Sequence, residues 1–186
     1  MAETHANYTL RLVDRNLNAQ KSEEYLKLNL AGRIPTLVDG DHVLFESPAI
    51  CIYIYELDAG STFIPPLGHP NHPLFFQWLA YLNNTLQAEY ILWRYAQNHA
   101  TAADNIEDIK AAQTPRLPGS ISRLDRELRD KSFLLGEEIS GADHFLFMMG
   151  LRCENARQPT SSFANLLLFM REMSQRPAVQ NVCEIE

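Results

Sequence analysis

Hydrophobic and polar positions alternate near the start of the chain. In residues 8–14, Leu10 and Leu12 fall on the same face, and this period of two predicts a β-strand. Residues 34–38 and 43–45 predict two further strands. The Asp-Gly pair between them favours the positive backbone dihedrals of a tight hairpin turn.

Two helices are predicted around these strands. Ser22, followed by two glutamates, predicts the N-cap of a short helix. Ser47 predicts a second N-cap, with Pro48 at the first helical position. Apolar residues then recur at helical spacing from Ile50 to Leu57, so one face of this helix must be buried.

The later part of the chain follows a helical period throughout. Pro115 and the pair Pro118-Gly119 predict a kink or a break within it. Residues 145–149 are apolar all round, which predicts a buried central helix, and Ser140 and Asp143 form a capping box at its start. Residues 165–174 predict a last helix, which a following proline ends.

A proline-rich segment separates the two patterns. Four of the ten prolines lie within residues 59–73, and this density is incompatible with a helix or a central strand. We interpret residues 59–73 as a linker between a domain of residues 1–58 and a domain of residues 74–186. The fold class is therefore α+β, with a small α/β unit followed by an all-helical unit.

Composition narrows the functional class of this chain of 186 residues. The formal net charge of −7 gives an acidic surface that repels phosphate backbones, so no nucleic-acid partner is expected. The longest apolar runs are far shorter than the roughly 20 residues of a membrane-spanning helix, and the first residues lack the features of a secretion signal. We expect a cytoplasmic protein with no membrane partner.

The cysteines and two neighbouring histidines also bear on the class. Cys51, Cys153 and Cys183 are widely spaced and form no Cys-x-x-Cys pair, which argues against a disulfide framework and a dithiol redox centre. His69 and His72 have no third ligand in register, so we interpret them as part of a polar linker and expect no metal site.

Two motifs in the first half carry a family resemblance. Residues 29–35 read Asn-Leu-Ala-Gly-Arg-Ile-Pro, and residues 46–53 read Glu-Ser-Pro-Ala-Ile-Cys-Ile-Tyr. Together they closely resemble the glutathione-binding half of the cytosolic glutathione transferases. The capping box and the Phe-Leu-Leu-Gly of residues 133–136 resemble the buried helix of that family's second half. The resemblance, which extends from about residue 8 to about residue 182, implies a thioredoxin-like domain followed by an all-α domain.

The resemblance also implies a glutathione site. Ile34-Pro35 resembles the family's cis-proline, which turns the backbone of Ile34 outward to pair with the tripeptide as with another strand. Ser47, at a helix N-terminus, would bind the γ-glutamyl carboxylate, and Glu46 the γ-glutamyl ammonium. Arg33 is a candidate for the glycyl carboxylate, although a solvated surface charge explains it equally well.

Four aromatic residues fall where the family's helical domain lines the site for an apolar co-substrate: Tyr81, Tyr90, Trp93 and Tyr95. Packing within the core is the alternative explanation for aromatics at helical spacing. Glutathione would be a co-substrate, and no cofactor is expected.

The chain departs from the family at its start. By this resemblance it begins at the second strand, Tyr8–Val13, which makes the thioredoxin-like domain truncated. The first strand, the first helix and the catalytic Ser, Tyr or Cys have no counterpart, so the catalytic residue is unknown. Three arrangements remain open: direct pairing of residues 8–13 with the Ile34 strand, strand exchange with another copy, and a detached N-terminal segment.

The function that the resemblance implies is conjugation of the glutathione thiolate to a small electrophile by a homodimeric transferase. One alternative is a non-catalytic glutathione transferase-like interaction protein that has lost its thiol-activating residue. A thiol–disulfide oxidoreductase has the least support, because no cysteine lies at the position that such a reaction needs.

Overall fold

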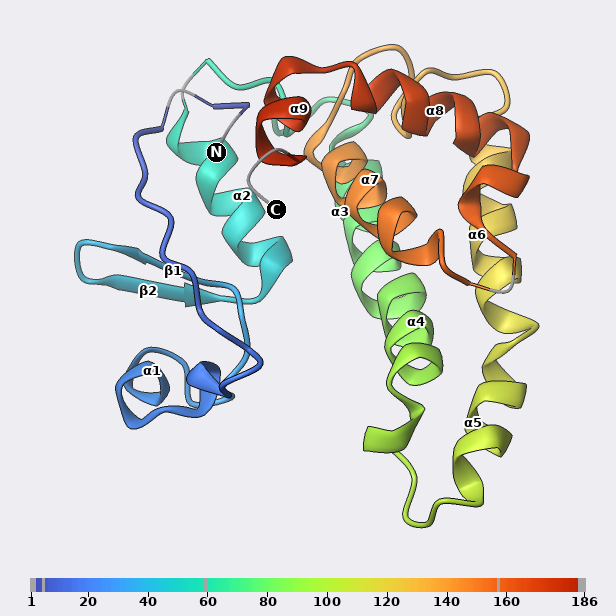
Figure 1. Ribbon diagram of the computed structural model, residues 1–186. Helices are drawn as coiled ribbons and strands as arrows, with labels where there is room; N and C mark the ends of the chain where they lie inside the picture. Colours follow the sequence, from blue (N-terminus) through green and yellow to red (C-terminus); the bar gives the residue numbers. More distant parts are fainter. Residues whose placement is uncertain (1–2, 5, 59, 157, 184–186) are drawn as a thin grey trace. The chain divides into compact units, whose positions relative to one another are not determined.

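The computed structural model describes residues 3–4, 6–58, 60–156 and 158–183. The chain folds as two compact units, residues 1–61 and residues 62–186 (Figure 1). The division therefore falls inside the proline-rich segment. The wider linker of residues 59–73 stays a prediction, and within it the first helix of the second unit already begins at His72.

The N-terminal unit is built around one β-hairpin. Its elements are a 3₁₀ turn η1 (Ala19–Lys21), α1 (Glu23–Leu28), β1 (Thr36–Asp39), β2 (His42–Phe45) and α2 (Ser47–Leu57). The strands are antiparallel, and the register pairs Thr36 with Phe45 and Asp39 with His42. The predicted hairpin turn is present, with a φ of 56° at Gly40, but it lies one residue later than predicted, because Asp39 pairs with His42 and the turn is formed by Gly40 and Asp41. The side chain of Ser22 accepts a hydrogen bond from the backbone of α1, which confirms the predicted cap.

The strand predicted for residues 8–14 is wrong. The backbone of residues 6–13 is irregular and makes no hydrogen bond to any described residue, and Leu10 and Leu12 are exposed. Alternation is a local property, whereas a strand exists only where neighbouring backbone supplies hydrogen bonds. The structure therefore does not contain direct pairing of this segment with β1, which was one of the three arrangements left open.

The C-terminal unit is helical throughout its described part. Its helices are α3 (His72–Tyr81), α4 (Gln87–Arg94), α5 (Asn105–Gln113), α6 (Arg116–Glu127), α7 (Gly141–Cys153), α8 (Ala164–Ser174) and α9 (Pro177–Cys183). A π-helical turn, Leu82–Leu86, joins α3 to α4, and 3₁₀ turns lie at Ala96–Asn98 and Thr160–Ser162. Pro115 lies in the break between α5 and α6, as predicted. Pro118 and Gly119, in contrast, do not split the helix, because they lie in the first turn of α6, where proline is tolerated. Pro177 starts a further helix, because proline is tolerated in the first helical turn.

Helix α7 lies at the centre of this unit, as the apolar run predicts. Most of its residues are buried, including Phe145 and Met149. The predicted capping box is confirmed at its start. The Asp143 carboxylate accepts hydrogen bonds of 2.8 Å from the backbone N–H of Ser140 and from that of Leu134. Asp143 therefore fixes the preceding loop to the helix and has a structural role.

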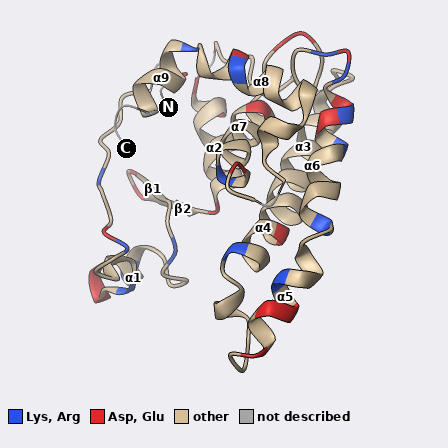
Figure 2. Ribbon diagram, turned by 45° about the vertical axis from the view of Figure 1, so that its right-hand side comes forward, with Lys and Arg blue, Asp and Glu red and all other residues tan. Residues whose placement is uncertain are grey.

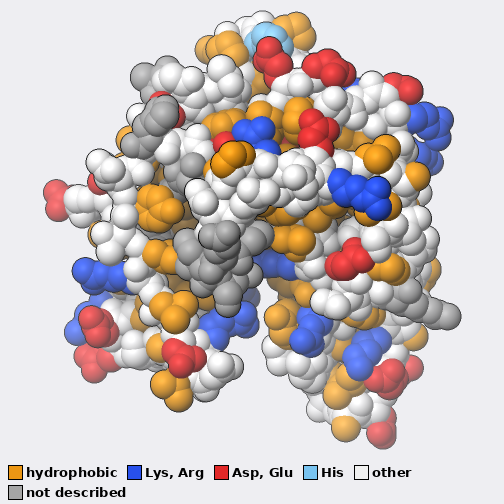
Figure 3. All heavy atoms as spheres, turned by 45° about the horizontal axis from the view of Figure 1, so that its top comes forward, with side chains coloured by type: hydrophobic (Ala, Val, Ile, Leu, Met, Phe, Trp, Pro, Cys, Tyr) orange, Lys and Arg blue, Asp and Glu red, His pale blue; other side chains and the backbone are white. Residues whose placement is uncertain are grey.

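Charged side chains of both signs are interspersed along the chain. Figure 2 shows acidic and basic residues mixed over the helices, and the face in Figure 3 likewise places Lys and Arg side chains beside Asp and Glu. This face shows no broad basic patch of the kind that binds nucleic acid. Among the described residues, no helix combines the length and apolarity needed to cross a membrane.

Candidate functional site

The five predicted glutathione-binding residues meet at the open end of the β1–β2 hairpin. The register pairs Thr36 with Phe45, so the residues that precede β1 and those that follow β2 leave the sheet at the same end. Arg33, Ile34 and Pro35 precede β1, and Glu46 and Ser47 follow β2. The fold thus brings together two motifs that are separate in the sequence.

The backbone of Ile34 is open to a ligand. The Ile34–Pro35 peptide bond is cis, as the resemblance implies. The side chain of Ile34 is exposed, and neither its N–H nor its C=O has a hydrogen-bond partner among the described residues. An extended peptide could therefore pair with this residue through its own backbone.

Helix α1 anchors the residue before Ile34. The hydroxyl of Tyr25 donates a hydrogen bond of 2.8 Å to the carbonyl oxygen of Arg33, and the Asn29 side-chain amide donates one of 2.9 Å to the same oxygen. The Tyr25 and Thr36 hydroxyls are also 2.8 Å apart and hydrogen-bonded. One network therefore joins α1, the loop and the first residue of β1.

The sequence alone predicts no role for Tyr25, and Asn29 is predicted only as part of a motif. A signal was nevertheless present in their spacing. Residues four apart on a helix lie on the same face, so a tyrosine and an asparagine at this spacing can reach one backbone acceptor together.

The N-terminus of α2 differs from the prediction. Glu46, and not Ser47, occupies the N-cap position, with a φ of 72° and a ψ of 112°, and Ser47 is the first helical residue. The positive φ of Glu46 turns the chain sharply at the end of β2, so the helix begins one residue earlier than the capping preference of serine indicates. Such backbone conformations are uncommon outside glycine and are often found at functional sites.

This helix start can hold an anion. Pro48 has no N–H, and the N–H groups of Ser47 and Ala49 have no hydrogen-bond partner among the described residues. These donors and the positive end of the helix dipole favour a carboxylate. The Ser47 hydroxyl and the exposed Glu46 carboxylate belong to adjacent residues at this helix start.

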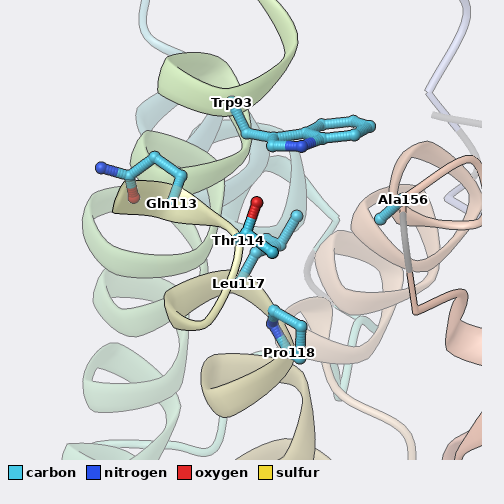
Figure 4. Close-up of a pocket in the computed structure, with 6 residues that line it drawn as sticks. All are labelled: Trp93, Gln113, Thr114, Leu117, Pro118 and Ala156. Atoms are coloured by element: carbon cyan, nitrogen blue, oxygen red, sulfur yellow. The ribbon is translucent and has the colours of Figure 1, made fainter. Parts of the chain in front are cut away.

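A small cavity lies in the helical unit (Figure 4). Its lining residues come from α4, from the α5–α6 region and from the segment after α7: Trp93, Gln113, Thr114, Leu117, Pro118 and Ala156. Its volume of about 10 Å³ has room for about one water molecule, which is too little for an organic substrate.

Tyr81, another of the four predicted aromatics, donates a hydrogen bond of 3.1 Å to the carbonyl oxygen of Ser120 and so joins two helices.

The cysteines and histidines form no second site in the described part of the chain. Burial raises the pKa of the half-buried Cys51 thiol and raises that of the fully buried Cys153 thiol to about 12. The side chain of Cys183 lies outside the described residues. His69 accepts a hydrogen bond from the backbone N–H of Asn71, and His72 bonds to a backbone carbonyl. Both histidines therefore belong to the turns that precede or begin α3.

Comparison with known proteins identifies relatives for this arrangement. A family model described as "Glutathione S-transferase, N-terminal domain" matches residues 1–56. Glutathione S-transferase 1 of Schizosaccharomyces pombe is 28% identical over 151 residues, which cover 77% of this chain and 63% of the relative. Glutathione S-transferase stcT of Emericella nidulans is 34% identical over 137 residues, which cover 70% of this chain and 57% of the relative. The chain thus spans less than two thirds of the length of either relative.

A solved structure shares the fold. The glutathione transferase homologue from Sulfitobacter, determined with bound glutathione, has a TM-score of 0.81 and 22% sequence identity. The match covers 92% of this chain and 83% of that protein. The fold predicted from the sequence, a thioredoxin-like unit followed by a helical unit, is therefore confirmed.

Proposed function

Because the chain belongs to the glutathione S-transferase family, we propose that it binds glutathione at the open end of the β1–β2 hairpin and conjugates the glutathione thiolate to a small electrophile. One observation carries this proposal. The backbone of Ile34 and the N–H groups at the start of α2, which have no hydrogen-bond partner among the described residues, lie at the same end of one hairpin. The glutathione bound in the Sulfitobacter protein of the same fold adds support.

Each part of the tripeptide has a matching group in this arrangement. The cysteinyl backbone pairs with the N–H and C=O of Ile34 beside Pro35, as an added strand would. The γ-glutamyl carboxylate accepts hydrogen bonds from Ser47 and the free N–H groups of α2, and Glu46 binds the neighbouring ammonium. Arg33 binds the glycyl carboxylate.

Conjugation then needs the thiolate form of the bound thiol. A thiol with a pKa of about 8.5 is only a few per cent ionised at neutral pH, so an environment that favours the anion raises the reactive fraction. The thiolate sulfur attacks the electrophilic carbon and forms a C–S bond, the leaving group departs with its electron pair, and the thiol proton goes to solvent. We assign no residue of the chain to thiol activation.

The family also leads us to propose the setting of this activity. The protein would act in the cytoplasm as a homodimer, with glutathione as a co-substrate and without a resident metal or cofactor. The acidic net charge of −7 supports small-molecule substrates over nucleic acid.

A titration with reduced glutathione near neutral pH tests both steps. Calorimetry measures binding, ultraviolet absorbance reports the thiolate, and chlorodinitrobenzene serves as a probe electrophile. We expect saturable binding that Ser47→Ala and Glu46→Gln each weaken by about tenfold. Glu56→Gln, at the other end of α2, is the matched control and should bind normally. A folded protein that does not bind glutathione would falsify the site, and binding without thiolate or turnover would exclude conjugation.

A further inference from the structure

Residues 6–13 form a segment with the pattern of a strand but without a partner. Tyr8, Leu10 and Leu12 alternate with polar residues, and Leu10 and Leu12 are 67% and 94% exposed. No hydrogen bond joins this segment to a described residue. An exposed run of alternating apolar side chains with free backbone groups is a template for pairing with another strand.

The hairpin has a complementary free edge. Among the described strands, β1 pairs with β2 alone. In an antiparallel ladder closed by a two-residue turn, the N–H and C=O groups of alternate residues face away from the partner strand. In β1 these residues are Thr36 and Val38. The register places Val38, Val43 and Phe45 on one face, and all three side chains are exposed.

The distribution of charge favours pairing of residues 6–13 with the hairpin over pairing of two hairpins or of two such segments. Residues 34–45 contain Asp39 and Asp41 but no Lys or Arg, whereas residues 6–13 contain Arg11 and no acidic residue. Two hairpin edges side by side would bring carboxylates together, and two segments would bring two arginines together. A segment on a hairpin brings opposite charges together, which stabilises strand pairing.

We propose that two copies of the chain exchange residues 6–13, so that the segment of each copy lies as a third strand along the β1 edge of the other. The contact is reciprocal, because each copy donates one segment and one edge, and it closes into a two-fold symmetric dimer. In the single chain a turn at residues 14–19 follows the segment, and no hydrogen bond among the described residues joins the segment to β1. A second copy is therefore the source of the strand.

This exchange goes beyond the proposed glutathione chemistry and is tested without glutathione. Light scattering after size exclusion measures the mass of the full chain at rising concentration. Hydrogen–deuterium exchange measures protection of individual segments in the same samples. We expect the mass to double with concentration, together with slower amide exchange in residues 7–13 and in β1.

Substitutions make the test specific. Leu12→Asp should raise the dimer dissociation constant by about tenfold or more, because a buried leucine becomes a charge. Leu17→Asp is the matched control, since Leu17 is 79% exposed and lies outside the segment, and it should leave the constant unchanged. Arg11→Glu should weaken the dimer, and adding Asp41→Lys in the same chain should restore part of the loss. Far-UV circular dichroism confirms that each variant is folded.

Three outcomes would overturn the proposal. A dimer in which residues 7–13 stay unprotected uses another interface. Protection of residues 7–13 that does not depend on concentration means pairing within one chain. A monomer without protection at every concentration means that the segment stays unpaired.

Discussion

The hydroxyl of Tyr25 lies 2.8 Å from the carbonyl oxygen of Arg33 and donates a hydrogen bond to it. Asn29 donates a second hydrogen bond to the same oxygen, so the chain is held from one side immediately before Ile34. Helix α1 has no buried residue. The helix, through Tyr25, and its C-cap residue Asn29 therefore contribute to the site mainly by these two hydrogen bonds, which position the loop.

Tyr25→Phe tests this positioning role. The variant loses one of the two donors to Arg33, and we expect a fall of about 1 kcal/mol in the free energy of unfolding together with weaker glutathione binding. Urea denaturation and calorimetry measure the two effects. Tyr53→Phe is the matched control, because the Tyr53 hydroxyl donates a hydrogen bond of 2.9 Å to Asp39 at the turn end of the hairpin. Equal losses of glutathione affinity in both variants would contradict a specific role for Tyr25.

Asp125 supplies the cap that α8 lacks in its own sequence. Phe163 occupies the N-cap position and makes no capping hydrogen bond with its side chain. The Asp125 carboxylate of α6 instead accepts hydrogen bonds of 2.8 and 3.0 Å from the backbone N–H groups of Asn165 and Leu166. Asp125→Ala should lower the free energy of unfolding by about 1–2 kcal/mol.

The control for this prediction is Asp130→Ala. Asp130 is exposed and has no hydrogen bond among the described residues, so its loss should change the free energy of unfolding by less than about 0.5 kcal/mol. Urea denaturation of both variants separates the two cases. A similar small effect for Asp125→Ala would mean that water replaces the cap without cost.

Local signals in the sequence predicted much of this structure. The hairpin turn, the α2 helix and the capping box of Asp143 each depend on residues close together in the chain, and all three are present. The meeting of the Ile34 loop with Ser47 followed from a two-motif resemblance together with a hairpin between the motifs.

The features that the sequence did not predict depend on residues distant in the chain or on backbone geometry that overrides a local preference. The alternation of residues 8–14 is a correct β pattern, but it does not supply a neighbouring strand. Serine capping preferences placed Ser47 outside α2, whereas the positive φ of Glu46 draws it into the helix. The cap that Asp125 gives to Asn165 spans two helices, and no local sequence rule encodes such a contact.

Glu154 makes the stability of the loop after α7 depend on pH. Partial burial alone would raise its pKa, but hydrogen bonds from the Ser161 hydroxyl, the Thr160 hydroxyl and the Ser161 backbone N–H outweigh that effect and lower the pKa below the ordinary value of 4.5. A lowered pKa in the folded state means that the unfolded chain binds the proton more readily. The stabilisation is therefore present above about pH 4.5 and is lost as the pH falls through the folded-state pKa.

The variant Glu154→Gln tests the direction of this pH dependence of stability. The variant should be less stable than the original protein at pH 7, and the difference in free energy of unfolding should shrink as the pH falls below about 4.5. Glu172→Gln removes an exposed carboxylate of α8 that has no hydrogen bond among the described residues, and it serves as the control. A difference that grows on acidification would show that the carboxylate destabilises this loop.

Cys153 should be inert in the folded protein. It is fully buried in α7, and burial raises the pKa of its thiol to about 12. At pH 8 such a thiol is about one part in ten thousand thiolate, and the thiolate is the form that reacts with iodoacetamide. We expect peptide mass spectrometry to find alkylation at the half-buried Cys51 before Cys153, which should react only in urea. Alkylation of Cys153 at the rate of Cys51 without urea would mean that α7 opens readily and is not the rigid centre of the helical unit.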